Sequence, residues 1–188
     1  DVIVERAYDT PTVHQGYIEP HATTVVFNDN GPSMIWCPTQ GHFDVRARVA
    51  QLMNLELGQI KVVASEIGGG FGGKTTVYLE PVALILSKKS GRPVKMEMSR
   101  GDVFRASGPA SASQSRIKIG AKMDGTITAM QATLHYEAGA FQGSPMGPGC
   151  MTVFTPYDVE NLYVEGFDVV VNKPKVAAYR APGAPQSI

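Results

Sequence analysis

Cysteine is scarce in this sequence. The 188 residues contain two, Cys37 and Cys150, which lie far apart and lack the CxxC spacing of a metal or redox site. Nothing therefore indicates a disulfide framework or a zinc site, and an iron–sulfur cluster would need about four cysteines. We expect both thiols to be reduced and buried, since unpaired cysteine behaves mostly as a small hydrophobe. A reduced state in turn suggests a cytoplasmic protein.

Net charge and long apolar runs are also lacking. The 17 basic side chains are balanced by 17 acidic ones, which removes the electrostatic footprint of a nucleic-acid or polybasic membrane binder. No segment approaches the roughly 20 consecutive apolar residues that cross a bilayer. We therefore expect a soluble protein that binds neither nucleic acid nor a membrane.

Apolar residues, by contrast, make up 43% of the chain, which is enough to build a hydrophobic core. The length fits one domain, or two small lobes over residues 1–100 and 101–188. The chain opens directly on VIVE and stops at APQSI, with no polar tail at either end. We expect it to be a piece of a longer polypeptide or a short split subunit.

The first hundred residues mix strand and helix signals. Two apolar, β-branched runs in 21–36 flank Asn28-Asp29-Asn30-Gly31, which predicts a hairpin. From His42 the apolar residues follow one helical stripe, and Gly58 is the expected helix end. The segments that follow are a strand over 59–67, a glycine loop, a helix within 75–91 and a strand over 94–99. Pro81 either begins that helix or kinks it.

The remaining residues are rich in strand signals. Two long runs, 113–123 and 126–141, flank Asp124-Gly125, and 161–171 returns to a strand pattern. The stretch GSPMGPGCM at 143–151 is irregular, and AYRAPGAPQ at 178–186 closes the chain as a loop. We expect an antiparallel ribbon after residue 100. Because helices and strands do not alternate strictly, the pattern favours an α+β fold over a doubly wound sheet.

The glycine loop lies within SEIGGGFGGKTT, residues 65–76. Gly68, four further residues, Gly73, Lys74 and Thr75 match the P-loop template for phosphate binding. Three observations argue against a nucleotide: Phe71 is bulky for a loop that wraps phosphate, no later strand offers a metal-binding aspartate, and the rest of the chain lacks parallel βα units. The run of glycines is better explained by close approach of another group to the main chain.

Three stretches in register resemble one family. GGGFGGK (68–74), AYRAPGAPQ (178–186), and GYIEPHATTV (16–25) with its following CPTQ turn are similar to the molybdenum-binding subunit of the xanthine dehydrogenase/aldehyde oxidase family. The resemblance covers essentially the whole chain, as the first part of a molybdopterin-binding domain over 1–188. It implies an α+β domain with βα repeats and a long ribbon.

The resemblance implies a molybdenum hydroxylase, which oxidises an aldehyde or an N-heteroaromatic C–H bond with oxygen from water. The cofactor would be molybdenum–molybdopterin, in bacteria often the cytosine dinucleotide form. Iron–sulfur clusters and FAD would lie on partner domains or subunits, beside the remainder of the molybdenum-binding subunit.

The resemblance also implies which residues lie at the cofactor. The pterin sulfurs hold the metal, so no direct protein ligand is expected. Arg180, in the second loop, would supply a fixed cation that stabilises negative charge at the metal centre. The glycine loop would bring its bare backbone close to the molybdenum, through Gly69, Gly70, Phe71 and Gly72.

Several positions depart from the pattern of the purine-oxidising members. Thr75 replaces a glutamate, Ala110 replaces a substrate-binding arginine and Pro182 replaces a phenylalanine that packs on the purine ring. These departures in the substrate pocket argue against xanthine as the substrate. Val13 occupies the place of a glutamine, for which Gln15 could substitute if the register shifts.

The family's catalytic glutamate belongs to a later segment, and these 188 residues contain no counterpart. We therefore expect no catalytic residue in this chain and no turnover by the chain alone. The acidic residues that could be mistaken for it are expected to be structural: Glu19, Glu66, Glu80 and Glu137. Two alternatives stay open, a P-loop-like nucleotide-binding module and a non-catalytic structural or interaction fragment.

Overall fold

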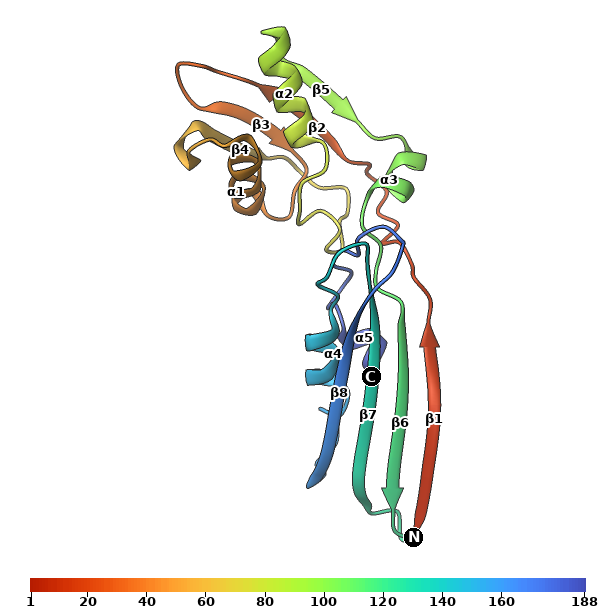
Figure 1. The fold of residues 1–188 in the computed structure, drawn as a ribbon. Helices are drawn as coiled ribbons and strands as arrows, with labels where there is room; N and C mark the ends of the chain where they lie inside the picture. Colours follow the sequence, from red (N-terminus) through yellow and green to blue (C-terminus); the bar gives the residue numbers. More distant parts are fainter. The chain divides into compact units, whose positions relative to one another are not determined.

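A computed structural model describes all 188 residues, which form two compact units (Figure 1). The central unit comprises residues 15–107, and the terminal unit comprises residues 1–14 together with 108–188. This division differs from lobes 1–100 and 101–188, because the first strand pairs with a strand that begins at Ser113. Each unit has its own four-stranded sheet.

The sheet of the central unit has the strand order β4-β3-β2-β5. Its strands are β2 (Ala22–Val26), β3 (Ser33–Cys37), β4 (Ile60–Ala64) and β5 (Val94–Glu97). Strands β2 and β3 form the predicted antiparallel hairpin, and β5 falls where a strand was expected. Strand β4 runs parallel to β3, since helix α1 (His42–Met53) carries the chain back between them.

Helix α1 ends earlier than predicted. Asn54 adopts the left-handed conformation with φ of 52°, and its backbone N–H closes the last turn on Ala50 and Gln51. Asparagine tolerates this conformation better than most residues, so it serves as the C-cap. Gly58 instead lies in the short 3₁₀ helix η1 (Leu57–Gln59).

Helix α2 (Glu80–Ser90) contains Pro81 in its first turn and is not kinked by it. Proline fits the first turn, where its missing N–H would have no intrahelical acceptor. Gly91 ends the helix with φ of 64°, as predicted. A further helix, α3 (Arg100–Ala106), was not indicated by periodicity; the Ser99 hydroxyl and the Asp102 carboxylate cap each other's backbone N–H at its start.

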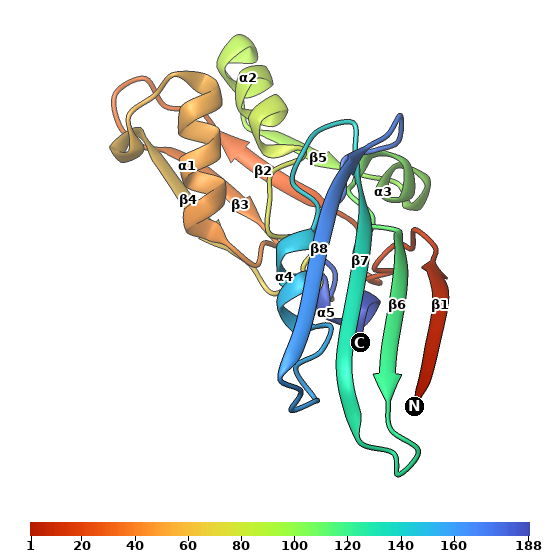
Figure 2. The same cartoon turned by 60° about the horizontal axis from the view of Figure 1, so that its bottom comes forward.

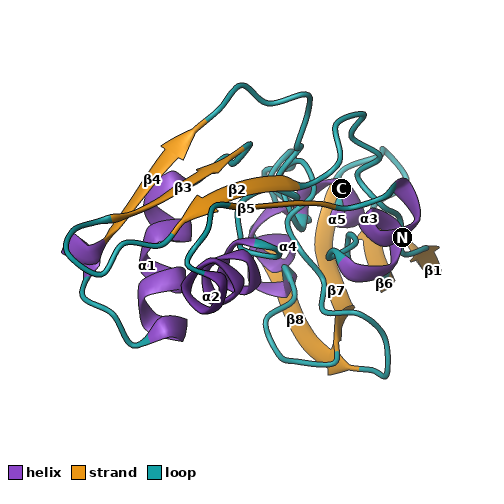
Figure 3. Ribbon diagram, turned by 90° about the horizontal axis from the view of Figure 1, so that it is seen from above, coloured by secondary structure: helices purple, strands orange, loops and turns teal.

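Helices α1 and α2 cover one face of the central sheet (Figure 2 and Figure 3). Their stripes of apolar residues pack on the alternate inward residues of the strands, as an amphipathic helix on a sheet requires. The buried core is formed by Val25, Ile35, Cys37, Val45, Val49, Ala50, Ile60, Ala83 and Leu84.

Cys37 belongs to that core, as predicted, and burial beside the Glu80 carboxylate raises the pKa of its thiol to about 12. Because the thiolate is the reactive form, we expect Cys37 to resist iodoacetamide at about pH 8 until the chain unfolds. Cys150 is half-buried rather than buried and serves as the internal reference. Mass spectrometry with and without denaturant checks this, and rapid labelling of native Cys37 would contradict it.

The terminal unit has the strand order β1-β6-β7-β8. Its strands are β1 (Val2–Thr10), β6 (Ser113–Ala121), β7 (Ile127–Gly139) and β8 (Asn161–Val170). Strands β6 and β7 form the predicted hairpin, with Gly125 at φ of 90° in the turn. Strand β1 is antiparallel to β6. Strand β8, however, is parallel to β7, so the expected wholly antiparallel ribbon is wrong.

A parallel pair needs a crossover, and here it includes helix α4 (Met146–Thr152). This segment was expected to be irregular because of its glycines and prolines. The closing loop likewise ends in a short helix, α5 (Ala184–Ser187). Helices α4 and α5 lie behind the sheet in the view of Figure 2. The core between helix and sheet contains Met130, Ala132, Leu134, Tyr136, Val153 and Phe154.

No helix in either unit combines the length and the apolar character that crossing a membrane demands.

Candidate functional site

The glycine loop lies between the end of β4 at Ala64 and the start of α2 at Glu80, in the central unit. Three of its residues have positive φ: Gly69 at 93°, Phe71 at 50° and Gly72 at 99°. A phenylalanine in this region costs roughly 1 kcal/mol or more, so the surrounding contacts must hold it there. The Phe71 side chain is 53% exposed and is therefore not held by burial.

The chain's own side chains lie tightly against the inner side of this loop. A Cβ atom on Gly68 would lie 2.6 Å from Glu19 Cβ, and one on Gly70 would lie 2.5 Å from Gln40 Oε1. On Gly73 it would lie 2.8 Å from a ring carbon of Tyr17. The close approach that the glycine run predicted is thus explained, for these three glycines, by packing within the central unit.

The backbone N–H groups of the loop fall into two sets. Gly68 donates to Glu19 Oε2 (2.8 Å), Gly73 to the carbonyl of Gly70 (2.7 Å), and both Gly72 (2.9 Å) and Lys74 (3.2 Å) to Gln40 Oε1. The N–H groups of the three residues between them have no acceptor in the chain: Gly69, Gly70 and Phe71. Consecutive unpaired donors form a place where an oxygen-bearing group can bind.

Lys74 does not behave as a P-loop lysine. Its side chain is 1% exposed, and its Nζ forms an ion pair with Glu19 Oε2 at 2.6 Å. The Thr75 hydroxyl, which would ligate Mg²⁺ in a P-loop, donates to the carbonyl of Gly72 (2.9 Å). Neither group is directed at a phosphate, so this geometry argues against the nucleotide-binding alternative.

Glu19 anchors the loop from the segment that precedes β2. Its backbone N–H donates to the carbonyl of Gly68 (3.1 Å), while its carboxylate accepts from Gly68 N–H and Lys74 Nζ. Partial burial alone would raise the pKa of the Glu19 carboxyl, but these two donors outweigh it and lower that pKa. Glu19 is therefore a charged structural partner, as expected.

The second predicted loop lies in the terminal unit and contains Arg180 and Pro182. Arg180 has φ of 36°, Ala181 has φ of 53°, and the Arg180 side chain is exposed. Gly183 fixes the end of the loop: its carbonyl accepts from the Tyr136 hydroxyl at 2.8 Å. A Cβ atom on Gly183 would lie 2.5 Å from the carbonyl oxygen of Pro145, so only glycine fits.

One backbone feature is shared by the two loops. Four non-glycine residues of the chain have positive φ, and three of them are Phe71, Arg180 and Ala181. The fourth, Asn54, is a helix cap. Phe71 adopts its positive φ inside the turn that Gly73 N–H closes on the carbonyl of Gly70, whereas Arg180 and Ala181 lie in a bend. Non-glycine residues in this uncommon conformation tend to cluster at functional sites, which makes the three an indication independent of the sequence motifs.

The other predicted positions are placed as follows. Ala110 is 2% exposed and its N–H donates to the carbonyl of Val13, so it presents no surface to a substrate. Val13 is largely exposed. Gln15 is buried in the central unit, and its side chain lies against Gly73, 3.1 Å from where a Cβ would be. Of the two, Gln15 is the one beside the glycine loop.

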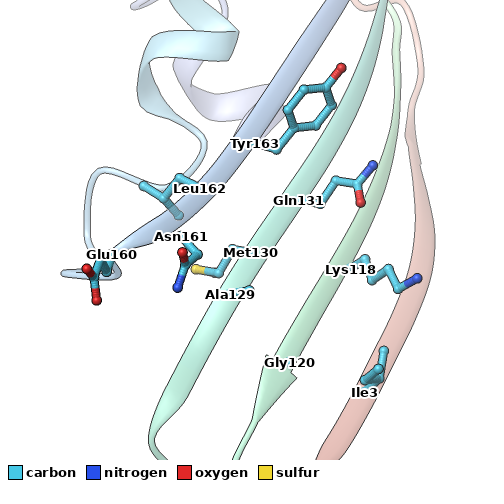
Figure 4. A pocket seen from close by; sticks show the side chains of 10 residues that line it. All are labelled: Ile3, Lys118, Gly120, Ala129, Met130, Gln131, Glu160, Asn161, Leu162 and Tyr163. Carbon is cyan, nitrogen blue, oxygen red and sulfur yellow. The ribbon is translucent and has the colours of Figure 1, made fainter.

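A shallow hollow of about 480 Å³ lies on the terminal sheet (Figure 4). The side chains of Lys118, Gln131 and Tyr163 form a row across neighbouring strands there. It contains none of the predicted site residues, and its open, mixed lining gives no sign of a specific ligand.

The molybdopterin cofactor-binding domain model matches residues 1–188, the whole of this sequence. The chain belongs to the molybdopterin cofactor-binding domain family. Its relatives are molybdopterin subunits of the xanthine dehydrogenase/aldehyde oxidase family, as predicted. The α+β fold of this domain is likewise confirmed.

Two relatives and one solved structure illustrate the likeness. The nicotinate dehydrogenase large molybdopterin subunit of Eubacterium barkeri is 31% identical over 193 residues, covering 100% of this chain and 45% of that protein. The xanthine dehydrogenase of Dictyostelium discoideum is 25% identical over 193 residues, covering 100% and 14%. The aldehyde oxidoreductase of Desulfovibrio gigas superposes with a TM-score of 0.92 at 26% identity, covering 100% and 21%. This molybdopterin-binding domain thus spans less than half the length of each.

The glycine loop of the molybdopterin-binding domain fits such a cofactor in its chemistry. Three adjacent N–H donors without acceptors suit an oxygen-bearing group, and half-buried Gly69 has no side chain that would separate its N–H from a ligand. Gly70 is itself buried. The residues that would hold the group in the central unit are Gly69, Gly70, Phe71 and Gly72.

Three residues that shape this loop were not predicted as site residues: Tyr17, Glu19 and Gln40. Glu19 and Tyr17 lie in GYIEP and Gln40 in CPTQ, so the family motifs contain them without showing their role. One signal was available. A lysine directly after a glycine run needs a carboxylate partner if it is buried rather than directed at a bound phosphate.

Proposed function

We propose that these residues form part of the cofactor-holding surface of a molybdenum hydroxylase that oxidises an aldehyde or an N-heteroaromatic C–H bond with oxygen from water. When bound, the molybdenum–molybdopterin supplies the redox chemistry, with the pterin sulfurs holding the metal. The observation that carries the proposal is the run of three consecutive unpaired N–H donors that ends at left-handed Phe71, in a chain whose whole length matches the family.

The chain's own part is to bind and orient. The N–H groups of Gly69, Gly70 and Phe71 donate to oxygen atoms of the bound group, and fixed donors of this kind cost no reorganisation during reaction. The exposed guanidinium of Arg180 provides a cation that favours a negatively charged group. Its left-handed backbone is held by the glycine-packed end of the second loop.

The substrate is proposed to be an aldehyde or an N-heterocycle other than xanthine. Thr75 carries no charge and its hydroxyl is bonded to the loop, while Pro182 offers no aromatic ring for stacking. Ala110 is buried and cannot supply a charged contact. The relatives include proteins named for nicotinate, xanthine and aldehyde. This range is consistent with a pocket whose substrate preference depends on residues such as Thr75 and Pro182.

Polypeptide other than these 188 residues is proposed to supply the catalytic glutamate, together with iron–sulfur clusters and FAD. The proposal is supported by the chain's span of 14% to 45% of the relatives described above. The chain alone would then be inactive, and the complete protein would act in the cytoplasm, with the cofactor in the cytosine dinucleotide form in a bacterial host.

The test is metal analysis of the complete protein purified with its partners. We expect molybdenum near one per chain by mass spectrometry, with dye-linked oxidation of an aldehyde or of members of an N-heterocycle panel. ATP with Mg²⁺ should leave its melting temperature unchanged, because Lys74 and Thr75 are bonded within the chain. A well-folded complex without molybdenum would refute the proposal, and stabilisation by ATP would favour the nucleotide-binding alternative.

A further inference from the structure

Gln40 contacts the glycine loop next to its three unpaired N–H groups. Its Oε1 accepts from both Gly72 N–H (2.9 Å) and Lys74 N–H (3.2 Å). The same oxygen lies 2.5 Å from where a Cβ on Gly70 would be, so it supports the loop directly beneath the unpaired donors.

Gln40 is itself held firmly by its backbone. Its N–H donates to the carbonyl of Lys74 (2.9 Å), which also accepts from the hydroxyl of buried Thr39 (3.1 Å). The Thr39 hydroxyl in turn accepts from Gly41 N–H (3.1 Å). The turn that contains Gln40 and the end of the loop are therefore one hydrogen-bonded unit.

The orientation of the Gln40 amide is fixed by these contacts. A carbonyl oxygen has two lone pairs, and here two N–H groups use both. If the amide were flipped, its NH₂ group would face the N–H groups of Gly72 and Lys74, and no hydrogen bond could form. The amide NH₂ therefore faces away from Gly72 and Lys74, on the exposed part of the residue.

We infer that Gln40 is a positioning residue for the cofactor loop. By pairing Gly72 and Lys74 N–H, it leaves the N–H groups of Gly69, Gly70 and Phe71 as the donor set. It also keeps Gly72 and Phe71 in their left-handed conformations, which would relax if the loop were released. The inference rests on the proposed function, because the group that this donor set serves is the molybdopterin cofactor.

The experiment compares Gln40→Met, which keeps the length but removes the acceptor, with Gln40→Glu, which keeps an accepting oxygen. Gln51→Met on the exposed surface of α1 is the matched control. All are made in the complete protein with its partners. Amide hydrogen exchange of peptides covering 65–76 is measured on cofactor-free protein, and molybdenum content and the Mo(V) electron paramagnetic resonance spectrum on loaded protein.

For Gln40→Met we expect exchange in 65–76 to rise about tenfold, and the Mo(V) spectrum to shift or molybdenum content to fall at least severalfold. Gln40→Glu should restore slow exchange, and Gln51→Met should match the wild type. Unchanged exchange in Gln40→Met would show that Gln40 does not hold the loop and would overturn the inference. Faster exchange with unchanged metal content and spectrum would overturn it too, because Gln40 would then be a purely structural contact. Wild-type protein without molybdenum would instead refute the proposed function, whatever the exchange result.

Discussion

Glu19→Gln is expected to lower the free energy of unfolding by about 3–5 kcal/mol. The change leaves the Lys74 ammonium, 1% exposed, without its counter-charge at 2.6 Å. A buried charge that has lost its partner is among the most costly defects in a folded protein. Denaturant titration of the purified protein, followed by a probe in the central unit, measures the change.

The partner substitution should cost less, and this asymmetry tests the argument. Lys74→Met removes the buried charge and leaves Glu19, whose side chain is 35% exposed and can gain water. The double variant should be more stable than Glu19→Gln alone, since it too lacks the buried ammonium. Glu5→Gln is the control, because its pair with Arg116 is exposed and worth less than about 1 kcal/mol. Equal losses from Glu19→Gln and Glu5→Gln would show that burial of the pair does not matter.

The same pair has a defined pH dependence. The lowered pKa of Glu19 means that its stabilisation is complete above about pH 4.3, the ordinary glutamate value, and is lost as pH falls through the lowered pKa. The gap in stability between wild type and Glu19→Gln should therefore close in acid. A gap that is constant down to about pH 2 would contradict the assignment.

Arg180→Met is expected to reduce kcat of the complete enzyme about 10²- to 10³-fold while molybdenum content stays near the wild-type level. The reason is the loss of a fixed cation beside a negatively charged centre, and it rests on the proposed function. Steady-state oxidation of the best substrate from the aldehyde and heterocycle panel, normalised to bound metal, is the measurement.

Two companion variants separate the charge of Arg180 from its backbone. Arg180→Lys retains the charge without the planar fork and should recover part of the activity. Arg6→Met is the control, because that arginine is exposed on β1 of the same unit and donates only to the neighbouring Glu5 carbonyl. Wild-type kcat in Arg180→Met with full metal content would remove Arg180 from the site.

Local signals explain which parts of the fold were predictable. The hairpins at Asn28–Gly31 and Asp124-Gly125 follow from the backbone preferences of single residues. So do the start of α2, with Pro81 in its first turn, and its end at Gly91. Strand β1 was not predicted because nearly all of its residues are exposed, so its sequence lacks the alternation of a half-buried strand. The parallel pairing of β8 depends on a crossover through a glycine- and proline-rich segment that reads as a loop.

The candidate site divides in the same way. Family motifs identified the glycine loop and Arg180, and the strained backbone of Phe71 and Arg180 agrees with them. The roles of Glu19 and Gln40 could not be predicted, because they depend on contacts across 55 and 34 positions of sequence to Lys74. Such contacts are set by the fold of the whole central unit, which no local pattern describes.

The placement of β1 bears on how the protein is made. When β1 emerges during synthesis, its partner β6 lies beyond the entire central unit, so this pair cannot form until residues 15–107 have also been made. Folding of residues 15–107 brings Tyr17 and Ser107 into hydrogen-bonding distance, at 3.3 Å, and thereby draws the two flanking segments together. The loop that must close for β1 to pair with β6 is then shortened from about ninety residues to a few, which lowers the entropic cost of pairing the two strands. Folding of the central unit therefore makes it easier to form a sheet to which that unit contributes no strand.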